Sequence, residues 1–390
     1  MSRRTTTRRR FLKGLAAAGL AWPALGARPV RAQQNLNAVL TPIRAQFDVP
    51  ALAAAFVRGE SLVAQGTVGL RRREGSEGAV DADPFHLGSC TKSMTATVIG
   101  WLVERGKLAW DAPLGETLAE LRDDMHPDYL GLTPVELLAH RTGMPGVNTP
   151  EAYDAFQLQL VQEFRLPLTV ARPIAQQRLA FARRVLSRAP VTPPGTTYDY
   201  SNFGYIVAGA VVEAACGKSW EEVTQEELFA PLGMASADYG APGTPNLEDA
   251  PWGHAGDGCA PVSPGALADN PPVYGPAGRA HAPLADWAKY ASLHLRGARG
   301  EGGLLLAPET FQRLQGDLFG QGYALGWGVT RRGWANGVTL VHAGSNTLWH
   351  AVAWIAPQRN AALLAATNCG AEHAFAAIDT AVVAMIQRYL

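Results

Sequence analysis

The amino-acid sequence predicts a mixed α/β (α+β) fold, in which an antiparallel sheet is flanked by helices and a helical region is inserted into it. Short apolar runs typical of strands lie near both ends of the chain, whereas the middle is helical in periodicity and rich in Gly and Pro. Because 47% of the 390 residues are hydrophobic and only 17% are charged, the chain can bury a large core. We expect one domain over 33–390, with the sheet drawn from about 36–88 and 300–390 and the helical region from about 89–299.

The expected elements of the sheet fall into two groups. Before the insertion, a helix at 36–47 precedes two strands at 51–57 and 61–70. After the insertion we expect four strands and a terminal helix, at 323–330, 338–342, 350–356, 361–367 and 372–390. The sequence PQRN is a turn before the last of these strands. One sheet built from both chain ends follows from this order.

The first 32 residues have the layout of an export signal. They contain eight Lys or Arg residues and no acid, with the segment TRRRFLK ahead of an apolar run at 14–25 and small residues near Ala32. TRRRFLK resembles the twin-arginine signal, which an export machinery reads. The alternative is a basic tail before an amphipathic helix, but the run is apolar on all sides. We therefore expect an exported protein, periplasmic or extracellular, that begins near Gln33.

The charge balance of the mature chain excludes some partners. Without residues 1–32 it has 26 basic and 34 acidic residues, a net charge of −8. Such a chain has no electrostatic reason to bind nucleic acid or an anionic membrane surface. No later stretch is long and apolar enough to span a membrane. The four cysteines have no metal-ligand spacing, and we expect Cys90 to be a small core residue.

The segment HLGSCTKSMTATVIG contains the first chemical motif. Its apolar residues after Met94 recur at helical spacing, so Ser89 and Lys92 lie on one face near a helix N-terminus. A buried lysine is costly unless it has a partner or a function. Burial would lower the pKa of Lys92, which makes it a candidate base for Ser89 as nucleophile. The alternative is a helix cap beside a surface lysine.

Two further stretches carry candidate residues. In PGTTYDYSNFGYIVAG, Tyr200 and Asn202 lie in a loop before a helix expected at 204–216. In LVHAGSNTLWH, a strand is expected to end at His342, and Gly344 allows close approach of a ligand to the backbone. Each residue also has a structural interpretation: Tyr200 as a core tyrosine, Asn202 as a helix N-cap and His342 as a packed strand histidine.

Taken together, Ser89-x-x-Lys92, Tyr200-x-Asn202 and His342-x-Gly344 resemble the three ordered motifs of the serine penicillin-binding protein and class C-type β-lactamase superfamily. Connecting segments such as FHLGSCTKSMTA, LTPVELLAHRTGMPG and YGPAGRAHAPLADWAKY are also similar to the family. The resemblance covers the chain from about Leu36 to its C-terminus. It implies a β-lactamase/D,D-peptidase-like fold. It implies neither a metal nor an organic cofactor for the enzyme.

The resemblance also implies a role for each matching residue. Ser89 would form an acyl-enzyme, and Lys92 and Tyr200 would share the proton transfers, with the identity of the base left open. Asn202 would bind the substrate amide or acyl oxygen, and His342 would line the site at the sheet edge. The backbone N–H groups of Ser89 and Ser345 would form an oxyanion hole, with Gly344 beside it.

The sequence departs from the family pattern at His342, and this departure affects which substrate is expected. β-Lactamases of this type usually carry a fixed positive charge, a lysine, where this chain has His342. That weakens a β-lactamase interpretation relative to an esterase or a D-amino-acid peptidase. The expected partners are small-molecule or peptide substrates: esters, amides, peptidoglycan fragments or β-lactams. A catalytically weak peptidoglycan-binding protein is the alternative outside the enzymes. His140, His254, His281 and His350 are interpreted as structural or surface residues.

Overall fold

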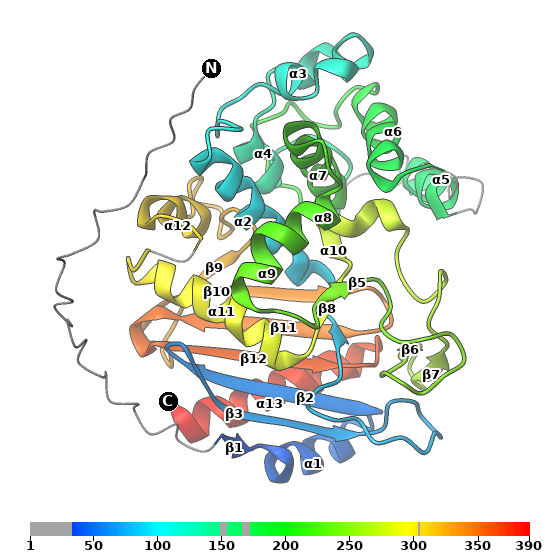
Figure 1. Ribbon diagram of the computed structural model, residues 1–390, viewed down its shortest axis with the longest axis vertical. Coiled ribbons are helices and arrows are strands. Elements are labelled where there is room, and N and C mark those ends of the chain that lie inside the picture. Colours follow the sequence, from blue (N-terminus) through cyan, green and yellow to red (C-terminus); the bar gives the residue numbers. More distant parts are fainter. Residues whose placement is uncertain (1–32, 149–153, 166–171, 303–304) are drawn as a thin grey trace, which may run out of the picture. The chain divides into compact units, whose positions relative to one another are not determined.

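The computed structural model describes residues 33–148, 154–165, 172–302 and 305–390, so the expected signal segment lies outside the described residues. Its largest sheet has seven strands in the order β1–β3–β2–β12–β11–β10–β9. The first three strands along the chain form one end and the last four the other (Figure 1). All pairs are antiparallel except β1 with β3. The strand bounds are Gln34–Asn35 (β1), Ala51–Arg58 (β2), Ser61–Gly69 (β3), Gly328–Arg332 (β9), Gly337–Ser345 (β10), His350–Ala356 (β11) and Ala361–Thr367 (β12).

The central strands are buried on both faces, which explains their continuous apolar sequences. In β2, Leu52, Ala54 and Phe56 belong to one core, whereas the alternate residues from Ala51 to Val57 belong to the other. The first core lies under α1 (Asn37–Gln46) and α13 (Glu372–Tyr389). On the opposite face, α11 (Leu284–Ala298) packs against β2, β11 and β12. Helix α11 therefore covers the sheet, although its sequence falls within the range expected for the helical insertion.

The inserted region forms the helical part above the sheet in Figure 1, together with α12, which packs on α2 although its sequence falls within the range expected for the sheet. Its central helix, α2, has buried side chains on every side, from Thr91 to Leu102, because α7, α10 and α12 pack around it. Helix α2 ends at Glu104, and Gly106 follows with a φ of +66°, a left-handed conformation that glycine commonly supplies at the end of a helix. The helices of this region are Thr91–Glu104 (α2), Leu114–Thr117 (α3), Pro134–Leu138 (α4), Asp154–Arg165 (α5), Ile174–Leu186 (α6), Asn202–Cys216 (α7), Trp220–Thr224 (α8), Ala230–Leu232 (α9), Gly275–Gly278 (α10) and Pro308–Gln315 (α12).

Hydroxyl groups satisfy the polar start of α2 within the core. The Thr91 hydroxyl donates to the Gly88 carbonyl at 2.7 Å, and the Ser93 hydroxyl donates to the Cys90 carbonyl at 2.8 Å. The Thr95 hydroxyl donates to Pro276 O in α10 at 2.7 Å. This first turn can therefore be buried without leaving its hydroxyl groups unpaired.

Short strands and turns connect the two regions. One small sheet has the order β4–β8–β5, and β6 and β7 form a hairpin. A disulfide between Cys259 and Cys369 links this hairpin to the segment after β12. The bounds are Phe85–His86 (β4), Asp238–Tyr239 (β5), Gly253–Ala255 (β6), Ala260–Val262 (β7) and Ala280–Ala282 (β8), with helical turns Gly88–Cys90 (η1), Ala119–Asp124 (η2), Pro127–Tyr129 (η3), Gln225–Phe229 (η6), Pro272–Tyr274 (η7) and Pro357–Arg359 (η8).

One expected strand is wrong in its first half. Tyr323 forms only an isolated bridge with Gly328, and the regular strand β9 begins at Gly328 rather than at residue 323. The chain turns at Gly326, which has a φ of +88° and lies against α2 so closely that a Cβ there would be 2.8 Å from the Ser93 Cα. An extended strand cannot pass through this position.

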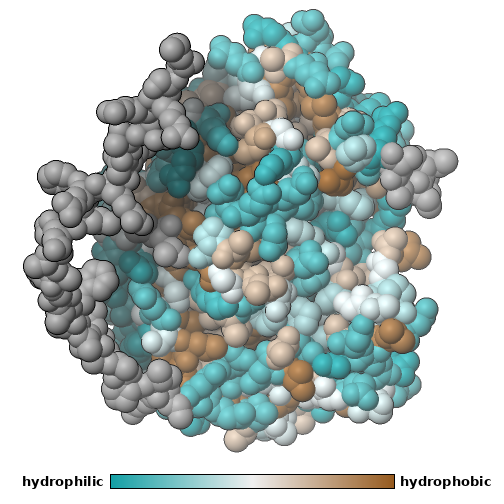
Figure 2. Space-filling model, in the orientation of Figure 1, coloured by the Kyte–Doolittle hydropathy of each residue, from teal (hydrophilic) through white to brown (hydrophobic). Residues whose placement is uncertain are grey.

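On the face shown in Figure 2, hydrophilic residues predominate and apolar residues are scattered among them. None of the helices in the described part of the chain combines the length and apolarity needed to span a membrane.

Candidate active site

The turn η1 and the first turn of α2 bring Ser89 and Lys92 together. Ser89 is partly exposed, whereas Lys92 is completely buried. The Nζ of Lys92 lies 3.0 Å from Ser89 Oγ, 2.7 Å from Asn202 Oδ1 and 2.6 Å from the Ala277 carbonyl oxygen. Helices α2, α7 and α10 thus converge on one amine. This is the pair that the sequence predicted at i and i+3.

Burial controls the charge of this amine. It lowers the pKa of Lys92 to about 7, and in the described residues no carboxylate offsets that effect. A neutral amine has two N–H donors and one lone pair. The two oxygen atoms that can only accept, Asn202 Oδ1 and Ala277 O, can take both N–H donors, which leaves the lone pair for the Ser89 hydroxyl. When the amine is neutral, its lone pair is therefore within reach of the Ser89 proton.

The loop before α7 positions Tyr200 and Asn202. The residue that caps α7 is Ser201, whose hydroxyl oxygen accepts from Phe203 N at 3.2 Å, so Asn202 is not the N-cap. Helix α7 begins at Asn202, two residues earlier than expected. Burial raises the pKa of the Tyr200 phenol, and its hydrogen bond with Ser89 lowers it in part. Tyr200 is therefore a neutral hydroxyl beside Ser89.

A group of aromatic rings lies behind these residues. His140 is buried with its ring centroid 4.2 Å from that of Tyr200, and its Nδ1 accepts from Ser201 N at 3.1 Å. Tyr205 and Tyr323 pack against the same imidazole, with centroid distances of 5.0 and 4.9 Å. Burial and the nearby Lys92 hold the pKa of His140 well below its ordinary value. This aromatic group packs against the Tyr200 ring, and the Lys92 amine lies 4.9 Å from the centroid of that ring and 5.6 Å from that of Tyr205.

His342 is a neutral residue with both ring nitrogens occupied. Its Nδ1 lies 2.8 Å from the Ala343 carbonyl, which can only accept, so Nδ1 carries the proton. Its Nε2 lies 3.2 Å from the Tyr323 hydroxyl, within hydrogen-bond distance. Burial, together with Lys92, lowers the pKa of His342 to about 3. His342 therefore packs inside the edge of the sheet and presents no positive charge.

The backbone of β10 approaches η1 through glycines. A Cβ on Gly344 would lie 2.0 Å from Leu87 O and 2.7 Å from Ser89 N. A Cβ on Gly88 would lie 2.4 Å from Ser345 N, and Gly88 has a φ of +50°. The backbone nitrogens of Ser89 and Ser345 consequently lie in one small region. Two N–H groups placed in this way can stabilise an oxyanion.

All seven residues singled out from the sequence lie in this one region: Ser89, Lys92, Tyr200, Asn202, His342, Gly344 and Ser345. Cys90 is buried, with its thiol 3.4 Å from His342 O, and burial raises its pKa, so it fits the predicted core role. The sequence analysis did not assign Tyr323 to the site, and it interpreted His140 as a structural or surface residue; the structure shows His140 as a buried structural residue behind Tyr200. The only sequence signal for His140 was its place in the connecting segment LTPVELLAHRTGMPG.

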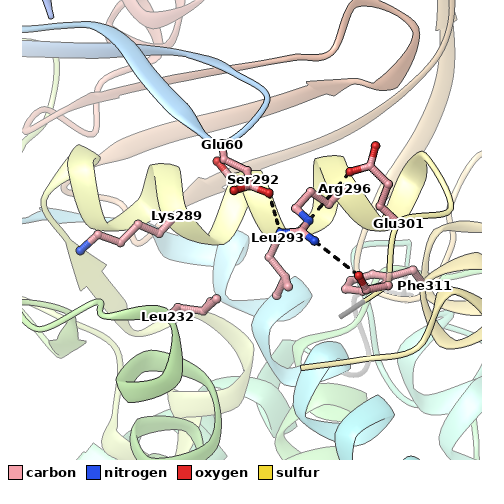
Figure 3. A pocket seen from close by; sticks show the side chains of 9 residues that line it. Glu60, Leu232, Lys289, Ser292, Leu293, Arg296, Glu301 and Phe311 are labelled. Carbon is pink, nitrogen blue, oxygen red and sulfur yellow. Dashed lines mark hydrogen bonds and ion pairs between the residues drawn. The ribbon is translucent and has the colours of Figure 1, made fainter. Parts of the chain in front are cut away.

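A separate pocket lies away from this region, between α11, α12, α9 and the turn after β2 (Figure 3). Its charged side chains are already paired: Arg296 with Glu60 at 2.5 Å, and Lys289 with Asp286 at 2.7 Å. A second group, Cys259, Cys369 and His373, has ligand atoms within 4.8 Å of one another, but its two thiols form the disulfide.

The fold and the Ser–Lys pair are those of beta-lactamase-like serine hydrolases. A family model described as beta-lactamase matches residues 36–387, and the chain belongs to this family.

Curated relatives within the family differ in activity. The chain is 29% identical over 280 residues to an unguisins hydrolase, ungD', of Aspergillus campestris, covering 68% of this chain and 47% of the relative. It is 30% identical over 193 residues to the esterase EstB of Burkholderia gladioli, covering 49% of this chain and 47% of the relative. The alignments thus span just under half of either relative.

Among solved structures, the octameric penicillin-binding protein homologue from Pyrococcus abyssi is similar with a TM-score of 0.69. The identity is 21%, and the alignment covers 91% of this chain and 78% of that one. This likeness confirms the expected fold.

Proposed function

We propose that the protein is an exported serine hydrolase that cleaves uncharged esters or amides through an acyl-enzyme on Ser89. The observation that carries this proposal is the hydrogen-bonded set of Ser89, Lys92 and Tyr200, in which the buried amine is 3.0 Å from the serine oxygen. A protein that only binds its ligand has no need for a desolvated lysine. The esterase among the relatives agrees with this reaction class.

In the proposed reaction, the neutral amine of Lys92 accepts the Ser89 proton as Oγ attacks the substrate carbonyl carbon. The N–H groups of Ser89 and Ser345 stabilise the resulting oxyanion. The proton then passes to the leaving group, by way of Tyr200 or directly from Lys92, as the bond to the leaving group breaks. Water attacks the acyl-enzyme by the same route and releases the acid, which regenerates Ser89. Lys92 is the base in this scheme, because burial lowers its pKa and raises that of Tyr200.

His342 favours uncharged substrates over β-lactams. With Nδ1 bonded to Ala343 O and Nε2 to Tyr323, its imidazole stays neutral and has no free donor for a substrate carboxylate. A carboxylate placed against this edge of the sheet would lose hydration without gaining a cation. The proposed acyl groups are therefore uncharged near the scissile bond.

Two observations support export. One is the basic and apolar segment at 1–32, which matches a twin-arginine signal in its sequence. The other is the disulfide between Cys259 and Cys369, since disulfides persist mainly in oxidising compartments. The proposed location of the mature chain is periplasmic or extracellular.

We expect a fluorescent fluorophosphonate to label the wild-type protein and Ser93→Ala equally, and not to label Ser89→Ala. Ser93 is the matched control, since it is a buried serine on the next turn whose hydroxyl donates to Cys90 O. Intact-mass and gel fluorescence measurements would read the result. Equal labelling of Ser89→Ala would remove Ser89 as the nucleophile.

The kcat/KM for a neutral p-nitrophenyl ester should increase with pH and level off above a pKa of about 7. The protonated ammonium of Lys92 cannot accept the Ser89 proton, so activity is lost as pH falls through that value. His342 has a pKa of about 3 and does not account for such a limb. A profile that is flat, or that falls, between about pH 5 and pH 9 would contradict Lys92 as the base.

A short-chain p-nitrophenyl ester should be hydrolysed at least about tenfold faster, in kcat/KM, than the same ester with a carboxylate at the end of its acyl chain. The reason is the neutral, fully bonded His342 imidazole. Initial rates at one pH compare the two esters directly. Preference for the charged ester, or a stable penicillin adduct on Ser89, would instead indicate carboxylate recognition and a penicillin-binding peptidase.

A further inference from the structure

A single buried carboxylate lies at the centre of a hydrogen-bond network beside the candidate site. Asp269, between β7 and η7, is 4% exposed. Its Oδ1 lies 3.1 Å from His86 Nε2, 3.0 Å from Asn346 Nδ2 and 2.7 Å from the backbone N of Asn270. Its Oδ2 accepts from Arg279 Nε at 2.9 Å. All four neighbours are donors, so the carboxylate is fully satisfied.

Three of these donors belong to segments that build the site. His86 precedes η1, and its Nδ1 accepts from Gly88 N at 3.1 Å, next to Ser89. Arg279 follows α10, whose Ala277 carbonyl accepts from Lys92. Asn346 directly follows Ser345 at the end of β10. The Asp269 carboxylate therefore connects three segments. These are the segment that leads into η1 and Ser89, the residue after α10, which carries the Ala277 acceptor of Lys92, and the end of β10, where the Ser345 N–H lies.

The proton positions are consistent with this arrangement. Since Nδ1 of His86 accepts from Gly88 N, its Nε2 carries the proton, and this nitrogen lies 3.1 Å from Asp269 Oδ1. Burial by itself raises the pKa of Asp269, but His86, Arg279 and Asn346 outweigh it and hold that pKa well below its ordinary range. The carboxylate stays ionised and bonded at any pH at which the protein would act.

We propose that Asp269 is a positioning residue for hydrolysis, which holds η1, α10 and the end of β10 in the relative places that an oxyanion hole requires. This inference rests on the proposed function. The approach of Gly88 to Ser345 leaves no space for a side chain, so a small shift of either segment changes the distance between their N–H groups. A misplacement of about 1 Å in a catalytic site can reduce the rate about a hundredfold.

Asp269→Asn should lower kcat for a neutral ester by about tenfold to a hundredfold and leave KM within about twofold. The amide keeps the size of the carboxylate but places an NH2 group against donors, which disturbs the alignment. The matched control is Asp83→Asn, a carboxylate that is also 4% exposed and is paired with Arg71 at 2.8 Å, and whose contacts do not include the site segments. Its kcat should stay near the wild-type value.

Asn346→Ala tests the link to β10 alone, and combining it with Asp269→Asn separates positioning from general destabilisation. If both substitutions act through the same contact, their effects on kcat will be less than multiplicative in the double variant. Thermal unfolding is measured for every variant. Should Asp269→Asn fail to fold, Asn346→Ala decides: a loss in kcat of about tenfold without a change in KM supports the proposal.

Two results would overturn the positioning role: unchanged kcat in both Asp269→Asn and Asn346→Ala, or an equal loss of kcat in Asp83→Asn. Failure of the proposed function has a different signature, because Ser89→Ala would then hydrolyse the ester as fast as the wild-type protein.

Discussion

The candidate site depends on an amine buried without a carboxylate partner in the described structure. Lys92 is enclosed by α2, α7 and α10, and its pKa falls to about 7 because burial disfavours the ammonium. A paired carboxylate would have restored the charge and removed the base. Two oxygen acceptors instead direct the lone pair at Ser89. The arrangement destabilises the charged form of one side chain, and a large apolar core around α2 provides the stability that makes this possible.

The fold supplies the remaining parts by bringing distant segments together. The antiparallel sheet joins the two ends of the chain, so that β10 meets the turn before α2 across about 250 residues of sequence, as in the contact of Cys90 with His342 O. Glycines at 88 and 344 allow the two backbones to touch. The polar network around Asp269 then links the residues next to η1, α10 and the end of β10. The sheet, the close contacts of the two glycines and the hydrogen bonds of Asp269 all meet near the backbone N–H groups of Ser89 and Ser345.

Much of this could be predicted from the sequence, and the exceptions have physical reasons. The strands at 350–356 and 361–367 and the Ser89–Lys92 pair were predictable, because they depend on local periodicity and on spacing along one helix. The strand expected from 323 was wrong because Gly326 packs against α2, which is a tertiary contact. Tyr323 and Asp269 were missed, and His140 was not connected with Tyr200, for the same reason: their partners lie far away in sequence. The disulfide was not predicted either, since spacing alone does not fix the pairing of cysteines.

The central claim, that Lys92 is neutral at the working pH, can be measured without any substrate. The chain has five lysines in all, and only four lie beyond residue 32, so the side-chain signals of a lysine-labelled mature protein can be resolved and assigned by NMR. Lys218, which is half-exposed and paired with Glu226, is the internal reference. The account predicts that the Lys92 signal titrates near pH 7, and that Lys92→Met removes it. Titration of Lys92 above about pH 10, with the ordinary value of a lysine, would contradict the account.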